Sequence, residues 1–344
     1  MAPIKSSLSR SISKLLSVGK NRDLSLRGNV QSIRLPPTES SGGTKSTFNN
    51  KFIHAFTSPG TLTVSGGAGS YNIEYVVVAG GGAGGRHNGG GGGGAGGYRT
   101  GSHTVTGPVS VTVGAGGESN SPNTDYPSND GANSSITGPG SLSITSEGGG
   151  GGGDSDTPDL ANANGHAGGS GGGAGSRSTD SGSAGPGNNP PTSPPQGNNG
   201  AGNAGSDNSA YREGSGGGGA GGAGGAAVLT NSPYRGGHGG LGVQAPSTFR
   251  DPSTPYGAPG PNSEGFWFAG GGAGGSYANP NQALGKGGAE GVSGGPYAGG
   301  ADGGRGATHG TGGGGGGADN SASGPEASKV GGRGGNGIVL IAIG

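Results

Sequence analysis

The residue types that most often carry out chemistry are sparse and scattered in this sequence. The six histidines, at positions 54, 87, 103, 166, 238 and 309, show no HxH or HxxxH spacing that would place two of them on one metal ion. The pattern Gly-x-Ser-x-Gly occurs at 168–172 and at 291–295, and in a hydrolase it would put a nucleophilic serine on a strand-to-helix turn. Neither copy lies between a strand and a helix, so we expect no nucleophilic serine here.

Phosphate and metal motifs are equally weak. Repeats of Gly-x-Gly-x-x-Gly follow from the abundance of glycine, and no Gly-Lys-Ser/Thr sequence exists for a phosphate loop. Asp154, Asp156 and Asp159 could line a cation loop, but Pro158 and the lack of a glutamate at the twelfth position do not fit a calcium loop. There is no cysteine, so thiolate sites are excluded. The sequence predicts a protein that is not an enzyme, with no cofactor and no catalytic or metal-ligating residue.

The composition excludes an ordinary apolar core. Glycine accounts for 96 of 344 residues and proline for 23, whereas average glycine usage is about 7%. Leu, Ile, Val and Phe together number 44, too few to fill a core for a chain of this length. Glycine at every position of 89–94 and 312–317 rules out the collagen triplet. Either the chain is disordered or contacts between backbones replace side-chain packing.

The first 51 residues differ from the rest. They hold nine Lys or Arg against two Asp or Glu, a net charge of +7, while 52–344 carries −7. Apolar residues at helical spacing predict an amphipathic helix over 4–18, and 20–50 looks like an irregular connector. The helix is expected to dock on another protein, or alternatively to pack on its own domain. The docking candidates are Ile4, Lys5, Leu8, Arg10, Ile12, Lys14 and Leu15. Without interleaved aromatics, nucleic acid is not an expected partner.

The β signal is concentrated in two places. Short β-branched or aromatic runs at 52–57, 61–65, 71–78, 103–106 and 109–113 are separated by glycine and proline turns. Valines at 109, 111 and 113 alternate with polar residues, which indicates one buried face, while the continuous run at 75–78 suits a strand covered on both sides. A further strand is predicted at 338–343, paired with the 71–78 region. No apolar stretch is long enough to span a membrane, so membrane insertion is not expected.

Glycine is segmented rather than spread evenly. Roughly nine tracts lie between the strands, and the heptapeptide AGGGAGG occurs at both 79–85 and 269–275. Such a run can form a polyglycine II helix, which has three residues per turn and no internal hydrogen bonds. Each N–H and C=O must then pair with a neighbouring helix. The predicted fold is therefore mainly β with non-regular structure. It has a small sheet base at 52–113 and 338–343, a bundle of polyglycine II helices with long polar loops, and a short N-terminal helix.

Several segments resemble the glycine-rich domain of bacteriophage tail fibres and adhesins. They are FTSPGTLTV at 56–64, IEYVVVAGGG at 73–82, GAGGY at 94–98, VTVGAGG at 111–117 and GGRGGNGIVLI at 331–341. The resemblance covers nearly the whole chain and implies a virion protein, bound to the phage tail or surface through its N-terminus. It further implies a polyglycine sandwich whose distal loops read a host surface glycan or outer-membrane protein. Many family members end on an aromatic or basic residue, whereas this chain ends Ala342-Ile343-Gly344.

Aromatic and arginine side chains on loops are the best candidates for recognition, because such residues dominate binding surfaces. The receptor-binding candidates are Tyr211, Arg212, Tyr234, Arg235, Phe249 and Tyr256. The aromatic run at 266–268 directly precedes a glycine tract, so it is expected to cap the lattice rather than to bind.

The sequence as a whole predicts two parts. Residues 1–51 would dock the protein to other virion proteins, and 52–344 would form the glycine-rich domain that recognises the host. A homo-oligomer, with a trimer as one option, is expected from fibre symmetry. The alternatives are a capsid decoration, spike or tail-joining protein without receptor binding, and an ice-binding polyglycine protein, which would need a flat face of small residues at regular spacing.

Overall fold

The described structure covers the glycine-rich part of the chain. The computed structural model describes residues 39–65, 69–87, 89–119, 128–155, 160–176, 182–202, 212–228, 234–276, 285–319 and 330–344. The chain divides at residue 37, into 1–36 and 37–344, so the boundary lies earlier than the predicted position at 51. The predicted helix over 4–18 and its docking candidates lie outside the described residues.

The unit is mainly β, as predicted, with two short 3₁₀ helices. No helix of the described segments is long and apolar enough to cross a membrane. The elements are β1 (Glu39–Ser41), β2 (Thr44–Phe48), β3 (Lys51–Phe56), β4 (Gly60–Ser65), β5 (Tyr71–Val78), β6 (Tyr98–Val105), β7 (Val109–Thr112), β8 (Ser134–Gly138), β9 (Leu142–Ser146), η1 (Leu160–Ala163), β10 (Val243–Gln244), η2 (Ser247–Phe249), β11 (Trp267–Phe268) and β12 (Ile338–Ile343).

Ten of these strands form two five-stranded antiparallel sheets. One sheet has the order β1-β4-β7-β8-β9 and the other β2-β3-β12-β5-β6. Buried side chains from both sheets form a single apolar cluster, including Leu62 and Ile136 from the first sheet and Ile73 and Ile341 from the second. The two sheets therefore pack face to face as a sandwich, in which alternate residues of each strand face inward.

The C-terminal strand β12 is the central strand of its sheet. It pairs with β5 from Ile338↔Val78 to Ile343↔Ile73, and its other edge pairs with β3, which confirms the predicted pairing with 71–78. Its odd-numbered residues face the sandwich core, while Ile338, Leu340 and Ala342 face a second apolar cluster on the outer side of the sheet. Both faces are covered, so all six residues are at most 1% exposed.

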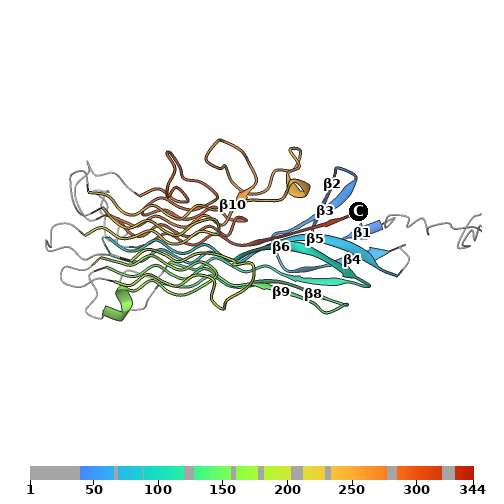
Figure 1. Cartoon of the computed structure of the whole chain (residues 1–344), viewed down its shortest axis with the longest axis horizontal. Coiled ribbons are helices and arrows are strands. Elements are labelled where there is room, and N and C mark those ends of the chain that lie inside the picture. Colours follow the sequence, from blue (N-terminus) through green and yellow to red (C-terminus); the bar gives the residue numbers. More distant parts are fainter. Residues whose placement is uncertain are drawn as a thin grey trace, which may run out of the picture. The chain divides into compact units, whose positions relative to one another are not determined.

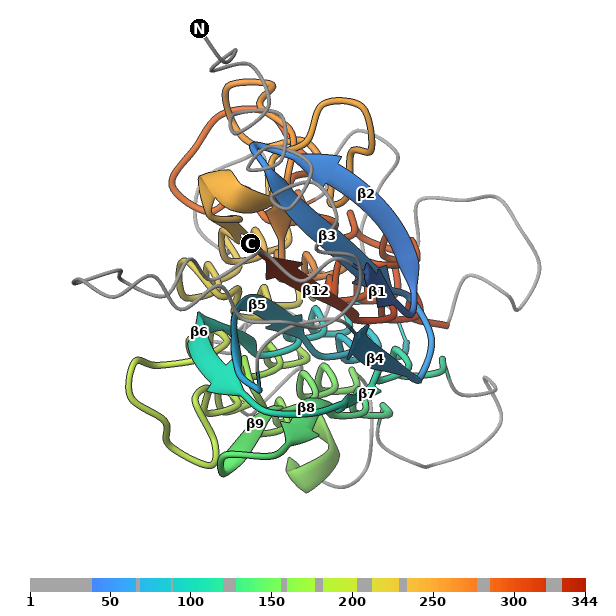
Figure 2. The same ribbon diagram turned by 90° about the vertical axis from the view of Figure 1, so that its right-hand side faces the viewer.

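Six strands run directly into or out of glycine tracts. Three tracts begin where a strand ends: at 79 after β5, at 113 after β7 and at 147 after β9. Three others end where a strand begins: at 97 before β6, at 133 before β8 and at 337 before β12. Figure 1 shows these tracts extending from the sheets toward the opposite side of the unit, and Figure 2 shows tracts end-on as rows of small coils. The sandwich thus sets the starting positions of the tracts.

The hydrogen bonds of the tracts repeat every three residues. In the tract 91–97, every third N–H group donates to the same neighbouring tract. The N–H groups of 91, 94 and 97 donate to the carbonyls of 153, 150 and 147. Those of 92 and 95 donate to the carbonyls of 215 and 218, and those of 93 and 96 to the carbonyls of 315 and 312. Its carbonyls accept from three further tracts, through residues 79–85, 170–173 and 272. These bonds measure 2.7–3.1 Å. A repeat of three with bonds only to neighbours is the pattern of polyglycine II, and this tract is surrounded by six others.

Side-chain amides and carboxylates complete the hydrogen bonding at the edges of this lattice. The Gly116 N–H donates to Asn336 Oδ1 at 2.9 Å, the Gly148 N–H to Asn133 Oδ1 at 2.8 Å, and the Gly151 N–H to Asp130 Oδ1 at 2.7 Å. Each of these side chains belongs to a neighbouring segment and supplies an oxygen to an N–H group that would otherwise lack an acceptor. This explains why Asn and Asp are common beside the glycine runs.

The structure extends the predicted set of strands. The described part of the predicted connector, from residue 39 on, forms β1 and β2, and β6 begins at Tyr98 rather than His103. The β8–β9 hairpin is absent from the predicted set of strands. Its alternation of polar residues with Ile136, Leu142 and Ile144 is the signal that could have revealed it.

Candidate recognition sites

Three of the predicted recognition residues lie at the end of the lattice farthest from the sheets, here called the far end. Figure 1 shows the tracts running from the sheets to this end. The described parts of four tracts stop there within one residue of Arg86, Asp154, Glu213 and Ser276. Arg212 directly precedes Glu213. Tyr234 and Arg235 begin an adjacent tract, in which the Gly237 N–H donates to the Gly214 carbonyl at 2.9 Å. Tyr211 lies outside the described residues. The fold thus brings Arg212, Tyr234 and Arg235 to one end of the lattice.

The other two candidates lie beside the sheet. Phe249, in η2, is 2% exposed and belongs to the apolar cluster on the outer face of the β12 sheet. A ring buried there cannot contact a receptor, so Phe249 leaves the set of candidate surface residues. Tyr256 is half-buried against the same cluster. Phe268 is fully buried with the tract residues Ala95 and Ala269, which agrees with the expected packing role of the 266–268 run.

A buried ion pair closes the far end of the lattice. The Arg86 guanidinium donates to Asp154 Oδ2 from Nη2 at 2.7 Å and from Nε at 3.1 Å, and the Arg86 main-chain N–H donates to Oδ1 at 2.8 Å. The two side chains are 3% and 0% exposed. Sequence reasoning considered Asp154 only as a cation ligand and overlooked Arg86. The sequence signal for Arg86 was its position as a single arginine at the end of a long glycine run.

Breaking this pair is expected to destabilise the protein strongly. Asp154→Ala leaves the guanidinium buried without its carboxylate, which costs about 3–5 kcal/mol. The matched control is Glu118→Ala, which removes an ion pair with Arg333 whose side chains are 64% and 63% exposed. That change is expected to cost less than about 1 kcal/mol. Urea unfolding measures both, and similar losses in the two variants would contradict the assigned role.

Glu213 is a second buried acid at the far end. Its side chain is fully buried, and Glu213 forms an isolated β-bridge with Ser276. Burial, partly offset by a hydrogen bond from Ser276, raises the pKa of Glu213 from 4.5 to about 7. Near neutral pH, a proton at this position therefore stabilises the packing between the tracts that carry Arg212 and Ser276.

The raised pKa predicts that stability falls as pH rises. Between about pH 4.5 and 7 the folded protein holds a proton that the unfolded chain has lost, so the free energy of unfolding decreases through this window. From pH 5 to 8 the loss due to this group is about 2–3 kcal/mol. Glu213→Gln should remove that part of the dependence. Denaturant unfolding at both pH values measures it, and an unchanged slope in the variant would refute the assignment.

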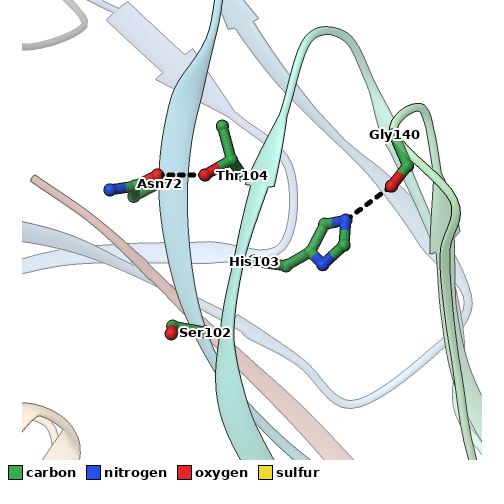
Figure 3. A pocket seen from close by; sticks show the side chains of 5 residues that line it. All are labelled: Asn72, Ser102, His103, Thr104 and Gly140. Carbon is green, nitrogen blue, oxygen red and sulfur yellow. Dashed lines mark hydrogen bonds between the residues drawn. The ribbon is translucent and has the colours of Figure 1, made fainter.

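The described residues contain no group of three His, Cys, Asp or Glu side chains that could hold a metal ion. A polar hollow of about 430 Å³ lies beside strand β6 of the sandwich. It is lined by Asn72 of β5, by Ser102, His103 and Thr104 of β6, and by Gly140 in the β8–β9 turn. Figure 3 shows these side chains around strand β6. Sequence reasoning did not identify this site, because its residues are common on any exposed strand.

The fold defines a class of protein in which a β-sandwich continues into a lattice of polyglycine II helices. Residues 57–344 match the model of a glycine-rich domain family, and the chain belongs to this family. The match begins just after β3 and runs through the last glycine tract and β12. Comparisons with curated proteins and with solved structures found no match.

Proposed function

We propose that this chain is a non-enzymatic bacteriophage virion protein, a tail fibre or tail-tip adhesin that binds the host cell surface. The observation that carries the proposal is the position in the fold of the segments that resemble such proteins. All five, at 56–64, 73–82, 94–98, 111–117 and 331–341, include residues of sandwich strands, namely β3, β4, β5, β6, β7 and β12. A rigid lattice that begins at these strands can hold residues such as Arg212 and Tyr234 far from the sheets.

Two further features support a role in recognition. The lattice fixes the far end through main-chain hydrogen bonds and through the buried Arg86–Asp154 pair, and preorganised residues lose less conformational entropy on binding. Arginine and tyrosine at that end are residue types that dominate binding energies. Docking to other virion proteins through residues 1–51, and assembly into a homo-oligomer, remain predictions that belong to this proposal.

The test uses the purified full chain, fluorescently labelled, on the cells that the phage infects. Saturable binding that blocks adsorption of the phage is expected. The double variant Arg212→Ala/Arg235→Ala should weaken binding about tenfold or more, whereas Glu118→Ala should not. A chain that labels the virion but does not bind cells would instead support the decoration or tail-joining role. Depression of the freezing point without cell binding would support the ice-binding alternative.

A further inference from the structure

The hollow beside β6 is an ordered polar site that the lattice does not use. It lies where the edge of one sheet faces the hairpin turn of the other: β6 is the last strand of its sheet, and Gly140 lies between β8 and β9. It is an open hollow of about 430 Å³, in which Asn72, Ser102, Thr104 and Gly140 are exposed and His103 is half-buried.

The hydrogen bonds around the hollow determine which groups remain for a ligand. His103 Nε2 lies 2.9 Å from the Gly140 carbonyl oxygen, which can only accept, so Nε2 carries the hydrogen. In the neutral imidazole Nδ1 is then a bare acceptor. The Thr104 hydroxyl donates to Asn72 Oδ1 at 2.5 Å, which leaves both hydrogens of the Asn72 amide as donors. Figure 3 shows the Asn72 and Thr104 side chains on one side of β6 and His103 with Gly140 on the other.

The backbone of the edge strand adds further groups. The Tyr98 N–H points away from β5, since it donates to the Gln196 carbonyl at 2.8 Å. Main-chain groups alternate in direction along an antiparallel edge strand, so the N–H and C=O of Ser102, four residues later, also point away from β5. The Ser102 hydroxyl makes no hydrogen bond within the described part of the chain. Ser102 therefore presents donors and acceptors of its main chain and side chain along the outer edge of β6.

The described residues that line this site include no carboxylate, ammonium or guanidinium group. An ionic ligand would lose its hydration without gaining a partner of opposite charge, and an apolar ligand would leave the polar groups unpaired. A hydroxyl group suits such a lining because it both donates and accepts. The chemistry therefore favours a neutral ligand that carries several hydroxyl groups on adjacent atoms.

We propose that this hollow binds a neutral saccharide, with Asn72 and Ser102 as its hydrogen-bonding groups. The inference rests on the proposed function in one respect, namely that host surface glycans supply the sugar. The site is separate from the far end of the lattice, so the chain would contact its host through two surfaces.

Binding is tested with the full chain and defined sugars. Saturation-transfer NMR and calorimetry with glucose, galactose and N-acetylglucosamine should detect saturable binding of at least one of them. Glucuronate and galacturonate should bind about tenfold or more weakly than their neutral counterparts. Ser102→Ala and Asn72→Ala should each weaken sugar binding several-fold, with Ser110→Ala on the exposed face of β7 as the matched control. Absence of binding by all three sugars, equal affinity for the uronates, or unchanged affinity in both variants would overturn the proposal.

The host-cell assay separates this inference from the proposed function. Sugar binding by a chain that does not bind cells would leave the saccharide site in place and refute the adhesin role. Cell binding that survives in a chain with no measurable sugar binding would refute the saccharide site and leave the adhesin role in place. Circular dichroism of each variant confirms that a lost signal does not reflect unfolding.

Discussion

Gly93→Ala is expected to destabilise the protein by at least about 3 kcal/mol, although it adds a single methyl group. Gly93 lies in the tract that has six neighbours, where its N–H donates to Gly315 and its carbonyl accepts from Gly272. A methyl group on its Cα would overlap the carbonyl oxygen of Gly82. That oxygen belongs to the backbone of a tract hydrogen-bonded on several sides, so no side-chain movement can relieve the overlap.

A control for this change lies in another glycine tract. A methyl group on Gly222 would have the Leu241 nitrogen as its nearest neighbour, at 3.6 Å, an ordinary contact. Gly222→Ala is therefore expected to be neutral, or to stabilise the protein by about 0.4–1 kcal/mol because the unfolded chain loses freedom. Chemical unfolding followed by circular dichroism compares both variants with the parent protein. Equal stability of all three would refute the close packing of tracts around Gly93.

Removal of β12 is expected to prevent folding of the described unit. Truncation after Gly337 removes six buried residues and leaves β3 and β5 without the strand between them. It also opens both apolar clusters, because β12 contributes to each. The truncated chain should be degraded rapidly at protease concentrations that the parent protein resists. Survival of a resistant core of wild-type size would contradict the central role of β12.

A point substitution in β12 tests the same role of the strand in a chain that still folds. Ile341→Ala removes a fully buried side chain from the sandwich core and should cost about 2–5 kcal/mol. Thr112→Ala, at an exposed position of β7, should change stability by less than about 0.5 kcal/mol. Thermal or urea unfolding distinguishes the two variants, and a small loss at Ile341 would show that the core relaxes around the cavity.

The strands with the strongest apolar signal could be predicted from the sequence, and the weaker ones could not. The runs at 71–78 and 338–343 are continuous and apolar because both faces of these strands are covered. By contrast, β2 (TKSTF) is largely exposed and has little apolar pattern. It forms because its main chain pairs with β3 from Thr44↔Ala55 to Phe48↔Lys51, and strand formation of this kind depends on the neighbouring strand rather than on local preference.

The candidate sites were harder to predict than the strands. An aromatic residue in a polar loop can face solvent or the core, and Phe249 and Tyr256 could not be separated on this point from Tyr234. Only the packing of the 245–268 segment on the outer face of the β12 sheet buries Phe249. Glu213 likewise gives no signal of its own, because its raised pKa arises from burial between tracts that are distant in sequence.

The sequence by itself determined that a folded form of this chain must use backbone as packing material, and it predicted that the last strand returns to the 71–78 region. Both follow from local composition, since glycine has no side chain to bury and an isolated apolar strand must find a partner. Only the tertiary structure decided which tracts become neighbours, and hence that Arg86 meets Asp154 and that Gly93 lies beside Gly82. Glycine tracts all offer the same N–H and C=O groups, so nothing in their own residues selects a partner. The selection comes from the sandwich, which fixes where six of the tracts begin or end, and from the packing of the remaining tracts around them.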